Sequence, residues 1–183
     1  FCPRGYDPVY NNQLIIEMIN ILKSKVKNYV FVFIGTPNIH QKVLFDLVIK
    51  YNINDQVLFL GRQSRKQILN LYNISELIIS ASKSDAGISS AVSESMSCEK
   101  AVLISDNRDN KLWINNNKNG FLFKNNNLKD LQSSFVKIIK QKRPFLLSIG
   151  ANARKTQLFR NNINIEMQKV ELVYRMICAK KTS

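Results

Sequence analysis

Apolar residues form short, uninterrupted runs separated by longer stretches of mixed character. The runs cover residues 29–34, 56–60, 77–81, 101–105 and 120–123. An uninterrupted apolar run bounded by turn residues is typical of a strand that is buried on both faces, as in a parallel sheet. The pattern therefore predicts parallel strands at these positions.

The stretches between the runs place apolar residues every three or four positions, which is the spacing of a helix with one buried face. They predict helices at 11–25, 38–51, 64–72, 127–140, 145–160 and 163–180, and a short helix that carries Glu94. Strands that alternate with helices need right-handed crossover connections, which build a doubly wound sheet. The predicted fold class is therefore an α/β, Rossmann-like, doubly wound parallel sheet.

Ligands of such sheets bind beyond the carboxyl ends of the strands. At these ends the sequence places Gly35, Arg62, the segment from Asp85 to Ser90, and the loop at Asp106. Glu94 follows on the next helix. We expect these residues to surround one crevice.

Small residues lead into the helix of Glu94. Backbone N–H groups at a helix start have no partner inside the helix, and the helix dipole adds partial positive charge there. Gly87, Ser89 and Ser90 leave room for an anion, so the segment is a candidate phosphate site. Glu94 could accept two hydrogen bonds from a sugar diol. The alternative is that the small residues are caps and packing contacts, and that Glu94 is a solvated helix residue.

The composition adds a strong positive charge, because 27 Lys and Arg residues outnumber 13 Asp and Glu residues and give a net charge of +14. Such a charge suits an anionic partner, either a phosphorylated ligand or an anionic membrane surface. The basic residues are scattered along the chain, so nucleic acid is not an expected partner. Peripheral association with a membrane stays open. No apolar run approaches the roughly 18 residues that span a bilayer.

Cysteine and histidine provide neither a metal site nor a disulfide framework. Cys2, Cys98 and Cys178 are far apart and odd in number, and His40 is the only histidine. Reduced thiols in the cytoplasm are the simplest interpretation, and no metal or other cofactor is expected. The chain opens with Phe1 rather than Met, which suggests a piece of a longer protein.

Residues 85–106 resemble the donor-binding segment of the retaining family 4 glycosyltransferases, which have the two-domain GT-B fold. The matching positions are Gly87, Glu94, Met96, Cys98, Val102, Ser105 and Asp106. Further segments similar to the same family are FVFIG at 31–35, DQVLFLG at 55–61, LYNISELIISAS at 71–82 and NGFLF at 119–123. The resemblance extends from Arg4 to Tyr174.

The resemblance implies that the chain is one half of a GT-B enzyme, the carboxyl-terminal domain that binds a nucleotide diphosphate sugar. Residues 1–160 would form this domain, and residues 161–183 a helix that crosses back to an acceptor-binding domain outside this sequence. The implied activity is transfer of the sugar to a glycan or lipid-linked acceptor, with retained anomeric configuration and without a metal ion. The implied location is the cytoplasm, at or near the inner face of the membrane.

Some functional residues of the family have a match in this chain, and others are replaced. Glu94 matches the acidic residue that contacts the ribose hydroxyls. Ala86 stands where the family has a second acidic residue, and Asp85 beside it is a candidate substitute. Arg4 matches a diphosphate-binding arginine, but Val9 occupies the position of the accompanying lysine. Arg4 and Asp85 are therefore the candidate catalytic residues.

The remaining donor contacts are expected from loops and from backbone N–H groups. Arg62 and Gln63 lie by position near the nucleobase, although Arg62 is equally well explained as a solvated surface residue. The complete set of predicted donor-binding residues is Gly35, Arg62, Gln63, Asp85, Ala86, Gly87, Ile88, Ser89, Ser90 and Glu94.

Two other functions stay open. One is a sugar-nucleotide 2-epimerase of the same fold, which needs catalytic carboxylates and histidines that the sequence does not show. The other is a non-catalytic domain that binds a nucleotide or a partner, which Ala86 and Val9 keep open. For a transferase, we expect the 183-residue chain to fold and bind donor without turnover, because the acceptor site is absent.

Overall fold

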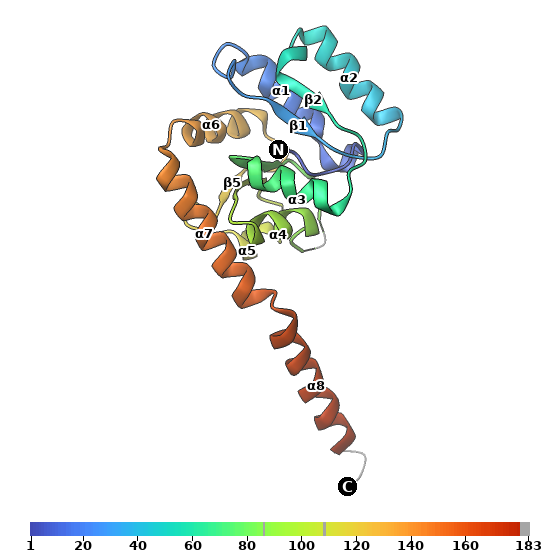
Figure 1. Ribbon diagram of the computed structural model, residues 1–183, viewed down its shortest axis with the longest axis vertical. Coiled ribbons are helices and arrows are strands. Elements are labelled where there is room, and N and C mark those ends of the chain that lie inside the picture. Colours follow the sequence, from blue (N-terminus) through green and yellow to red (C-terminus); the bar gives the residue numbers. More distant parts are fainter. Residues whose placement is uncertain (86, 108, 180–183) are drawn as a thin grey trace.

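Short parallel strands alternate with helices along almost the whole chain (Figure 1). The computed structural model describes residues 1–85, 87–107 and 109–179. Its strands are β1 Phe31–Phe33, β2 Val57–Phe59, β3 Leu77–Ser80, β4 Ala101–Ser105 and β5 Phe121–Phe123. Its α-helices are α1 Asn12–Leu22, α2 Ile39–Tyr51, α3 Arg65–Ile74, α4 Ser90–Ser97, α5 Asn110–Trp113, α6 Leu128–Ile139, α7 Arg143–Arg160 and α8 Ile163–Ala179.

The sheet consists of two parallel parts that the first two residues join. β1 pairs with β2, and β4 pairs with both β3 and β5. Between these parts, the Cys2 N–H donates to the Val32 carbonyl at 2.8 Å, and the Ile79 N–H donates to the Phe1 carbonyl at 2.9 Å. The order across the sheet is therefore β2, β1, the Phe1–Cys2 segment, β3, β4, β5, with the carboxyl ends of all strands at one edge.

Both faces of the sheet are covered, as the uninterrupted apolar runs predicted. Alternate side chains of β3, β4 and β5 enter two separate apolar clusters. The first, which includes Ile79, Leu103 and Phe123, packs against α1, α2 and α6. The second, which includes Ile78 and Ile104, packs against α3, α4 and α7. The predicted doubly wound parallel sheet is confirmed.

Some boundaries differ from the sequence prediction. β1 is shorter than the apolar run 29–34, because its partner β2 offers only three residues to the ladder. α3 continues beyond residue 72 to Ile74, and α7 begins before residue 145, with Pro144 in its first turn. α5 was not predicted, since it is a single short turn in a polar segment. The predicted end of the last helix, residue 180, lies outside the described residues.

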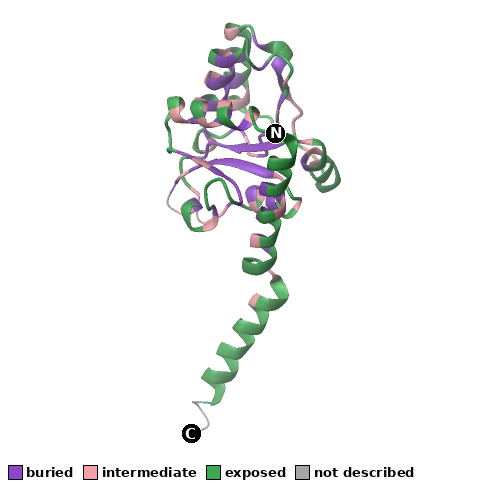
Figure 2. Cartoon of the chain, turned by 90° about the vertical axis from the view of Figure 1, so that its left-hand side faces the viewer, coloured by how far each residue is buried: buried purple, intermediate pink, exposed green. Residues whose placement is uncertain are grey.

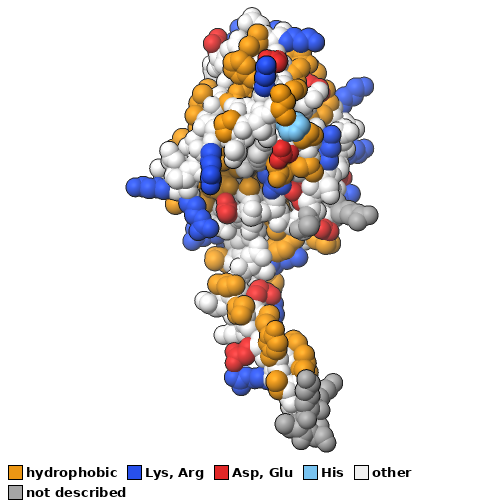
Figure 3. Space-filling view, turned by 90° about the vertical axis from the view of Figure 1, so that its right-hand side faces the viewer, with side chains coloured by type: hydrophobic (Ala, Val, Ile, Leu, Met, Phe, Trp, Pro, Cys, Tyr) orange, Lys and Arg blue, Asp and Glu red, His pale blue; other side chains and the backbone are white. Residues whose placement is uncertain are grey.

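α7 and α8 differ sharply in how they contact the rest of the molecule. α7 packs closely on the turn before β4, where a Cβ on Gly150 would lie 1.9 Å from the Glu99 carbonyl oxygen. α8 extends away from the sheet, and its described residues are exposed or only half-buried (Figure 2). Figure 3 shows apolar side chains along α8, and Lys and Arg side chains scattered over the rest of the face in view. Among the described helices, none is both long enough and apolar enough to cross a bilayer.

Candidate functional site

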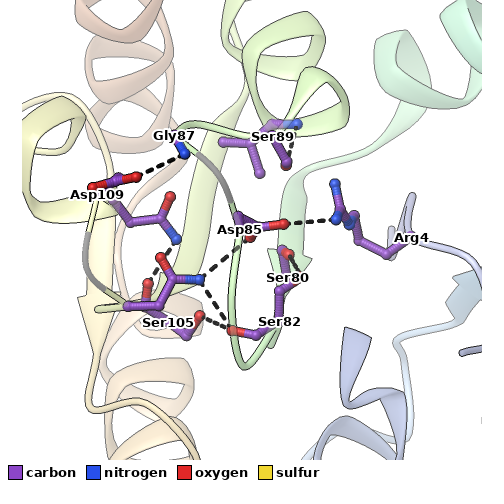
Figure 4. A network of polar contacts seen from close by, with 11 residues as sticks. Arg4, Ser80, Ser82, Asp85, Gly87, Ser89, Ser105 and Asp109 are labelled. Atoms are coloured by element: carbon purple, nitrogen blue, oxygen red, sulfur yellow. Dashed lines mark hydrogen bonds and ion pairs between the residues drawn. The ribbon is translucent and has the colours of Figure 1, made fainter. Parts of the chain in front are cut away.

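A buried ion pair connects the amino-terminal segment to the loop after β3. Arg4 follows the Phe1–Cys2 segment, and its Nη2 lies 2.7 Å from Asp85 Oδ1 (Figure 4). The two side chains are only 13% and 7% exposed. The Arg4 guanidinium also lies over the Tyr10 ring, 4.4 Å from its centroid. The two candidate catalytic residues of the sequence are thus in direct contact.

The loop after β4 supplies a hydrogen-bond donor to the second oxygen of the Asp85 carboxylate. Asn107 Nδ2 donates to Asp85 Oδ2 at 3.3 Å and to the Ser82 carbonyl at 3.2 Å. That carbonyl also accepts from Ser105 Oγ at 2.6 Å, and Asn110 Nδ2 donates to the Ser105 carbonyl at 2.9 Å. Both oxygens of the Asp85 carboxylate therefore have partners, and the loops after β3 and β4 form one network.

The start of α4 holds a carboxylate from the same network. Gly87 has a left-handed backbone with φ of +81°, and its N–H donates to Asp109 Oδ2 at 2.8 Å (Figure 4). Asp109 is the residue before α5, yet its side chain makes no capping hydrogen bond to that helix. Ser89 caps α4 through a long hydrogen bond of 3.4 Å from the Val92 N–H. A negatively charged group thus already lies against the predicted phosphate-binding loop.

Glu94 lies on α4 and is exposed to solvent. The single hydroxyl proton of Tyr72 is shared between two acceptors, the Ala91 carbonyl at 3.0 Å and Glu94 Oε2 at 3.3 Å. Burial raises the pKa of Tyr72, and the charge of Glu94 raises it further. The phenol therefore stays protonated and can donate, while the Glu94 carboxylate keeps accepting capacity for a ligand.

The loops after β1 and β2 make fewer side-chain contacts. The Gly35 N–H donates to the Gly61 carbonyl at 3.1 Å, so these loops lie side by side. A Cβ on Gly35 would lie 2.9 Å from the Tyr6 ring, which shows how closely the amino-terminal segment approaches. Gln63 donates to the Leu60 carbonyl at 2.6 Å. Arg62 is exposed, and no described residue forms a hydrogen bond or ion pair with it.

The structure brings only part of the predicted set together. Arg4, Asp85, Gly87 and Ser89 lie around one network at the carboxyl edge (Figure 4). Among the other described members, Ile88 is half-buried against the second apolar cluster, and Ser90 is exposed at the start of α4. The members that lie outside the network are Gly35, Arg62, Gln63 and Glu94. Ala86 lies outside the described residues.

Sequence reasoning placed the loop at Asp106 at this edge but missed the side chains that follow it. Asn107, Asp109 and Asn110 supply side chains to the network, and Asn107 and Asn110 are buried. Buried polar atoms without a partner in the described part of the chain include Arg4 Nε, Asn107 Oδ1 and Asn110 Oδ1. The signal was available, because a run of Asp and Asn directly follows an apolar strand at the ligand-binding edge.

A hollow of about 770 Å³ lies elsewhere, at the amino ends of the strands. Its lining mixes apolar side chains, such as Tyr29, Leu77 and Phe135, with the charged residues Glu76, Glu99, Lys100 and Arg143, and none of the predicted site residues lines it. Within the described ranges, no group of three or more His, Cys, Asp or Glu side chains could hold a metal ion. The carboxyl edge is therefore the candidate site.

The family model of the "Glycosyl transferases group 1" matches residues 4–156, a range that includes the whole network. The chain belongs to this family. A comparison with proteins of curated function gave no significant match. The predicted glycosyltransferase family is thus confirmed at the level of group 1.

Several solved structures have the same fold. A glycosyltransferase from Rickettsia africae is 22% identical with a TM-score of 0.86, covering 97% of this chain and 47% of that one. HepE from Anabaena, solved with UDP and glucose, is 18% identical with a TM-score of 0.82, covering 95% and 48%. The carboxyl-terminal domain of the group 1 protein LpcC from Francisella tularensis is 18% identical with a TM-score of 0.76, covering 89% and 84%.

These likenesses identify the fold as the Rossmann-like domain of GT-B glycosyltransferases, as the sequence predicted. The chain spans about half the length of the Rickettsia and Anabaena proteins.

Proposed function

We propose that this chain is the donor-binding domain of a retaining family 4 glycosyltransferase. It would transfer a sugar from a nucleotide diphosphate sugar to a glycan or lipid-linked acceptor. One observation carries the proposal: the ion pair with Asp85 holds Arg4 beside the loop that begins α4. A guanidinium and a helix amino terminus next to each other form a site suited to a diphosphate.

In this proposal each part of the donor has its own contacts. The diphosphate lies against Arg4 and the backbone N–H groups from Gly87 to Ser90, and the ribose hydroxyls bind the exposed carboxylate of Glu94. Asp85 orients Arg4, since both of its oxygens are engaged within the protein. Uridine is the preferred base, because the similar Anabaena protein was solved with UDP.

The chemical contribution of this domain is to stabilise the leaving diphosphate. As the bond to the sugar breaks, negative charge grows on the diphosphate, and donors already in place stabilise that charge without reorganisation. Arg4 and the start of α4 supply such donors. We propose metal-independent transfer, because these groups stabilise the negative charge of the diphosphate that a metal ion would otherwise stabilise.

The proposal places the acceptor site on a separate domain that α8 approaches, and the donor domain at residues 1–160. The chain by itself would then bind donor without transferring the sugar, because the groups that align the acceptor are absent. The same proposal puts the protein in the cytoplasm, near the inner face of the membrane.

The first test is the binding of UDP to Glu94→Ala, measured by isothermal titration calorimetry. A hydrogen bond to a charged group contributes about 1.5–3 kcal/mol, so affinity should fall roughly 10- to 150-fold. Glu76→Ala is the matched control, because Glu76 is also exposed but lines the hollow at the opposite edge of the sheet. Equal affinities of wild type and Glu94→Ala would remove Glu94 from the site.

The second test is turnover with a panel of nucleotide sugars, comparing the 183-residue chain with a longer form that includes an acceptor domain. Sugar transfer only by the longer form is the expected result. A longer form that binds UDP but transfers no sugar would support the non-catalytic alternative. Epimerised nucleotide sugar would support the 2-epimerase.

A further inference from the structure

We propose that Asp109 is an internal competitor of the donor diphosphate, which holds the Gly87 N–H until the donor displaces it. This inference rests on the proposed function, because it concerns the same loop. It assigns to Asp109 a role in setting donor affinity that neither the sequence motif nor the family membership indicates.

The first observation is the position of the Asp109 carboxylate. Its Oδ2 accepts from the Gly87 N–H at 2.8 Å, and Gly87 is the first of the residues proposed to contact the diphosphate. One N–H group cannot give a full hydrogen bond to both a carboxylate and a phosphate oxygen. Two anions held at the same donor would also repel each other. The donor can therefore make this contact only after Asp109 has left it.

The second observation is that Asp109 has a second possible partner. It is the residue before α5, a position from which aspartate often accepts a hydrogen bond from the first turn of the helix. Its side chain makes no such bond, and its backbone is helical there, with φ of −93° and ψ of −20°. Its side chain reaches across to Gly87 in the loop after β3 instead. A local change in the backbone and side chain of Asp109 could exchange one contact for the other without moving the sheet.

The third observation is the contrast with Asp85, the other carboxylate of the network. The Asp85 side chain is only 7% exposed and has partners on both oxygens, Arg4 and Asn107. Asp109 is half-buried, and Gly87 is its side-chain partner within the described residues. Asp85 is thus fixed in the protein, whereas Asp109 can yield its place to a ligand.

The consequence is a reduced apparent affinity for any ligand that needs the Gly87 N–H. Apparent affinity equals intrinsic affinity multiplied by the fraction of molecules in which the site is free. If Asp109 occupies the contact nine-tenths of the time, its removal should strengthen binding about tenfold. The gain should be confined to ligands that carry phosphate.

The test is calorimetric titration of UDP, inorganic pyrophosphate and uridine into wild type and Asp109→Ala. The matched control is Asp130→Ala, since Asp130 is also a carboxylate that accepts from a backbone N–H, that of Lys124, at 2.6 Å. We expect Asp109→Ala to bind UDP and pyrophosphate at least threefold more tightly than wild type, with uridine unchanged and Asp130→Ala equal to wild type. Asp109→Asn, which removes the charge but keeps the shape, should show a smaller gain.

Equal or weaker pyrophosphate binding by Asp109→Ala would overturn the inference, as would the same gain in Asp130→Ala. If pyrophosphate behaves as expected but UDP does not bind to any variant, the competitor role stands and the proposed nucleotide site fails. If neither ligand binds to any variant, both proposals fail. The backbone amide signal of Gly87 in a nitrogen-15 NMR spectrum gives a second measurement. It should shift both on substitution of Asp109 by Ala and on addition of pyrophosphate to wild type.

Discussion

The two sides of the carboxyl edge differ in how their polar residues are held. One side, called the linked side here, consists of Arg4, Asp85, Gly87, Asn107 and Asp109, whose polar groups are joined by an ion pair and hydrogen bonds. The other, called the open side, consists of residues 35–38 and 61–63, and its Arg62 is exposed without a partner among the described residues. Substitutions on the linked side should therefore change stability as well as binding, whereas polar substitutions on the open side should change binding alone.

The largest expected effect is that of Arg4→Ala. Removal of one partner from a buried ion pair leaves an uncompensated buried charge, which costs about 3–5 kcal/mol of unfolding free energy. Arg62→Ala on the open side should stay within about 0.5 kcal/mol of wild type. Urea denaturation followed by circular dichroism measures both.

A second substitution separates the effect of the unpaired Asp85 charge from the effect of the lost packing of Arg4. Adding Asp85→Asn to Arg4→Ala removes the stranded carboxylate, and should recover part of the lost stability. A loss below about 1 kcal/mol for Arg4→Ala alone would mean that the two sides do not differ in this way.

A smaller effect is expected on the open side, at one place where packing is tight. In Gly35→Ala the new Cβ would lie 2.9 Å from the Tyr6 ring and 3.1 Å from Gly5 Cα, so one of them must shift. Such overpacking costs about 1–3 kcal/mol. Gly61→Ala is the comparison, because nothing lies within 4 Å of its Cβ position and only the backbone, with φ of +66°, opposes the change.

That backbone conformation should cost about 1–2 kcal/mol. Thermal unfolding of both variants measures the difference. A Gly35→Ala protein as stable as wild type would show that the open side is loose throughout.

The smallest expected effect concerns Tyr72 beneath Glu94. Tyr72→Phe loses the hydrogen bonds to the Ala91 carbonyl and to Glu94, with a cost of about 1 kcal/mol at neutral pH. In wild type, burial first and the Glu94 charge second raise the pKa of Tyr72 in the folded state. Its contribution to stability is therefore complete below the unfolded pKa of about 10, and is lost as the pH rises above that value.

Unfolding free energies at pH 9, 10 and 11 should consequently fall less steeply in Tyr72→Phe than in wild type. Tyr174→Phe, at an exposed tyrosine of α8, is the matched control. Parallel pH profiles for wild type and Tyr72→Phe would contradict the assignment.

The sequence predicted the sheet well because the relevant signal is local. Each apolar run contains a strand, and β4 matches its run at both ends because all five of its residues are buried. The joining of the two sheet parts by Phe1 and Cys2 was beyond a local pattern, since two residues have no periodicity to detect. α5 was missed because its four residues are too few to show a helical period.

The sequence predicted at which edge of the sheet the candidate site lies, but not which of its residues contact one another. Gly87, Ser89 and Asp85 lie at the expected edge, because strand direction alone places them there. The partner of Asp85 is 81 residues away in the sequence, and that of Gly87 is 22 residues away. No spacing rule connects such positions, so Asp85 could not be recognised as the partner of Arg4, nor Asp109 as the partner of Gly87.

The Phe1–Cys2 segment also has a consequence for the order in which the chain can fold during synthesis. Within this sequence these residues are synthesised first, yet they pair with Val32 on one side and with Leu77 and Ile79 on the other. The part of the sheet formed by β1 and β2 can assemble as soon as residue 59 is free. The central position must wait for β3, Leu77–Ser80, so the middle of the sheet can close only after that strand has left the ribosome. A nascent chain that stops before Leu77 would expose both edges of that gap, and we expect chaperones to bind it.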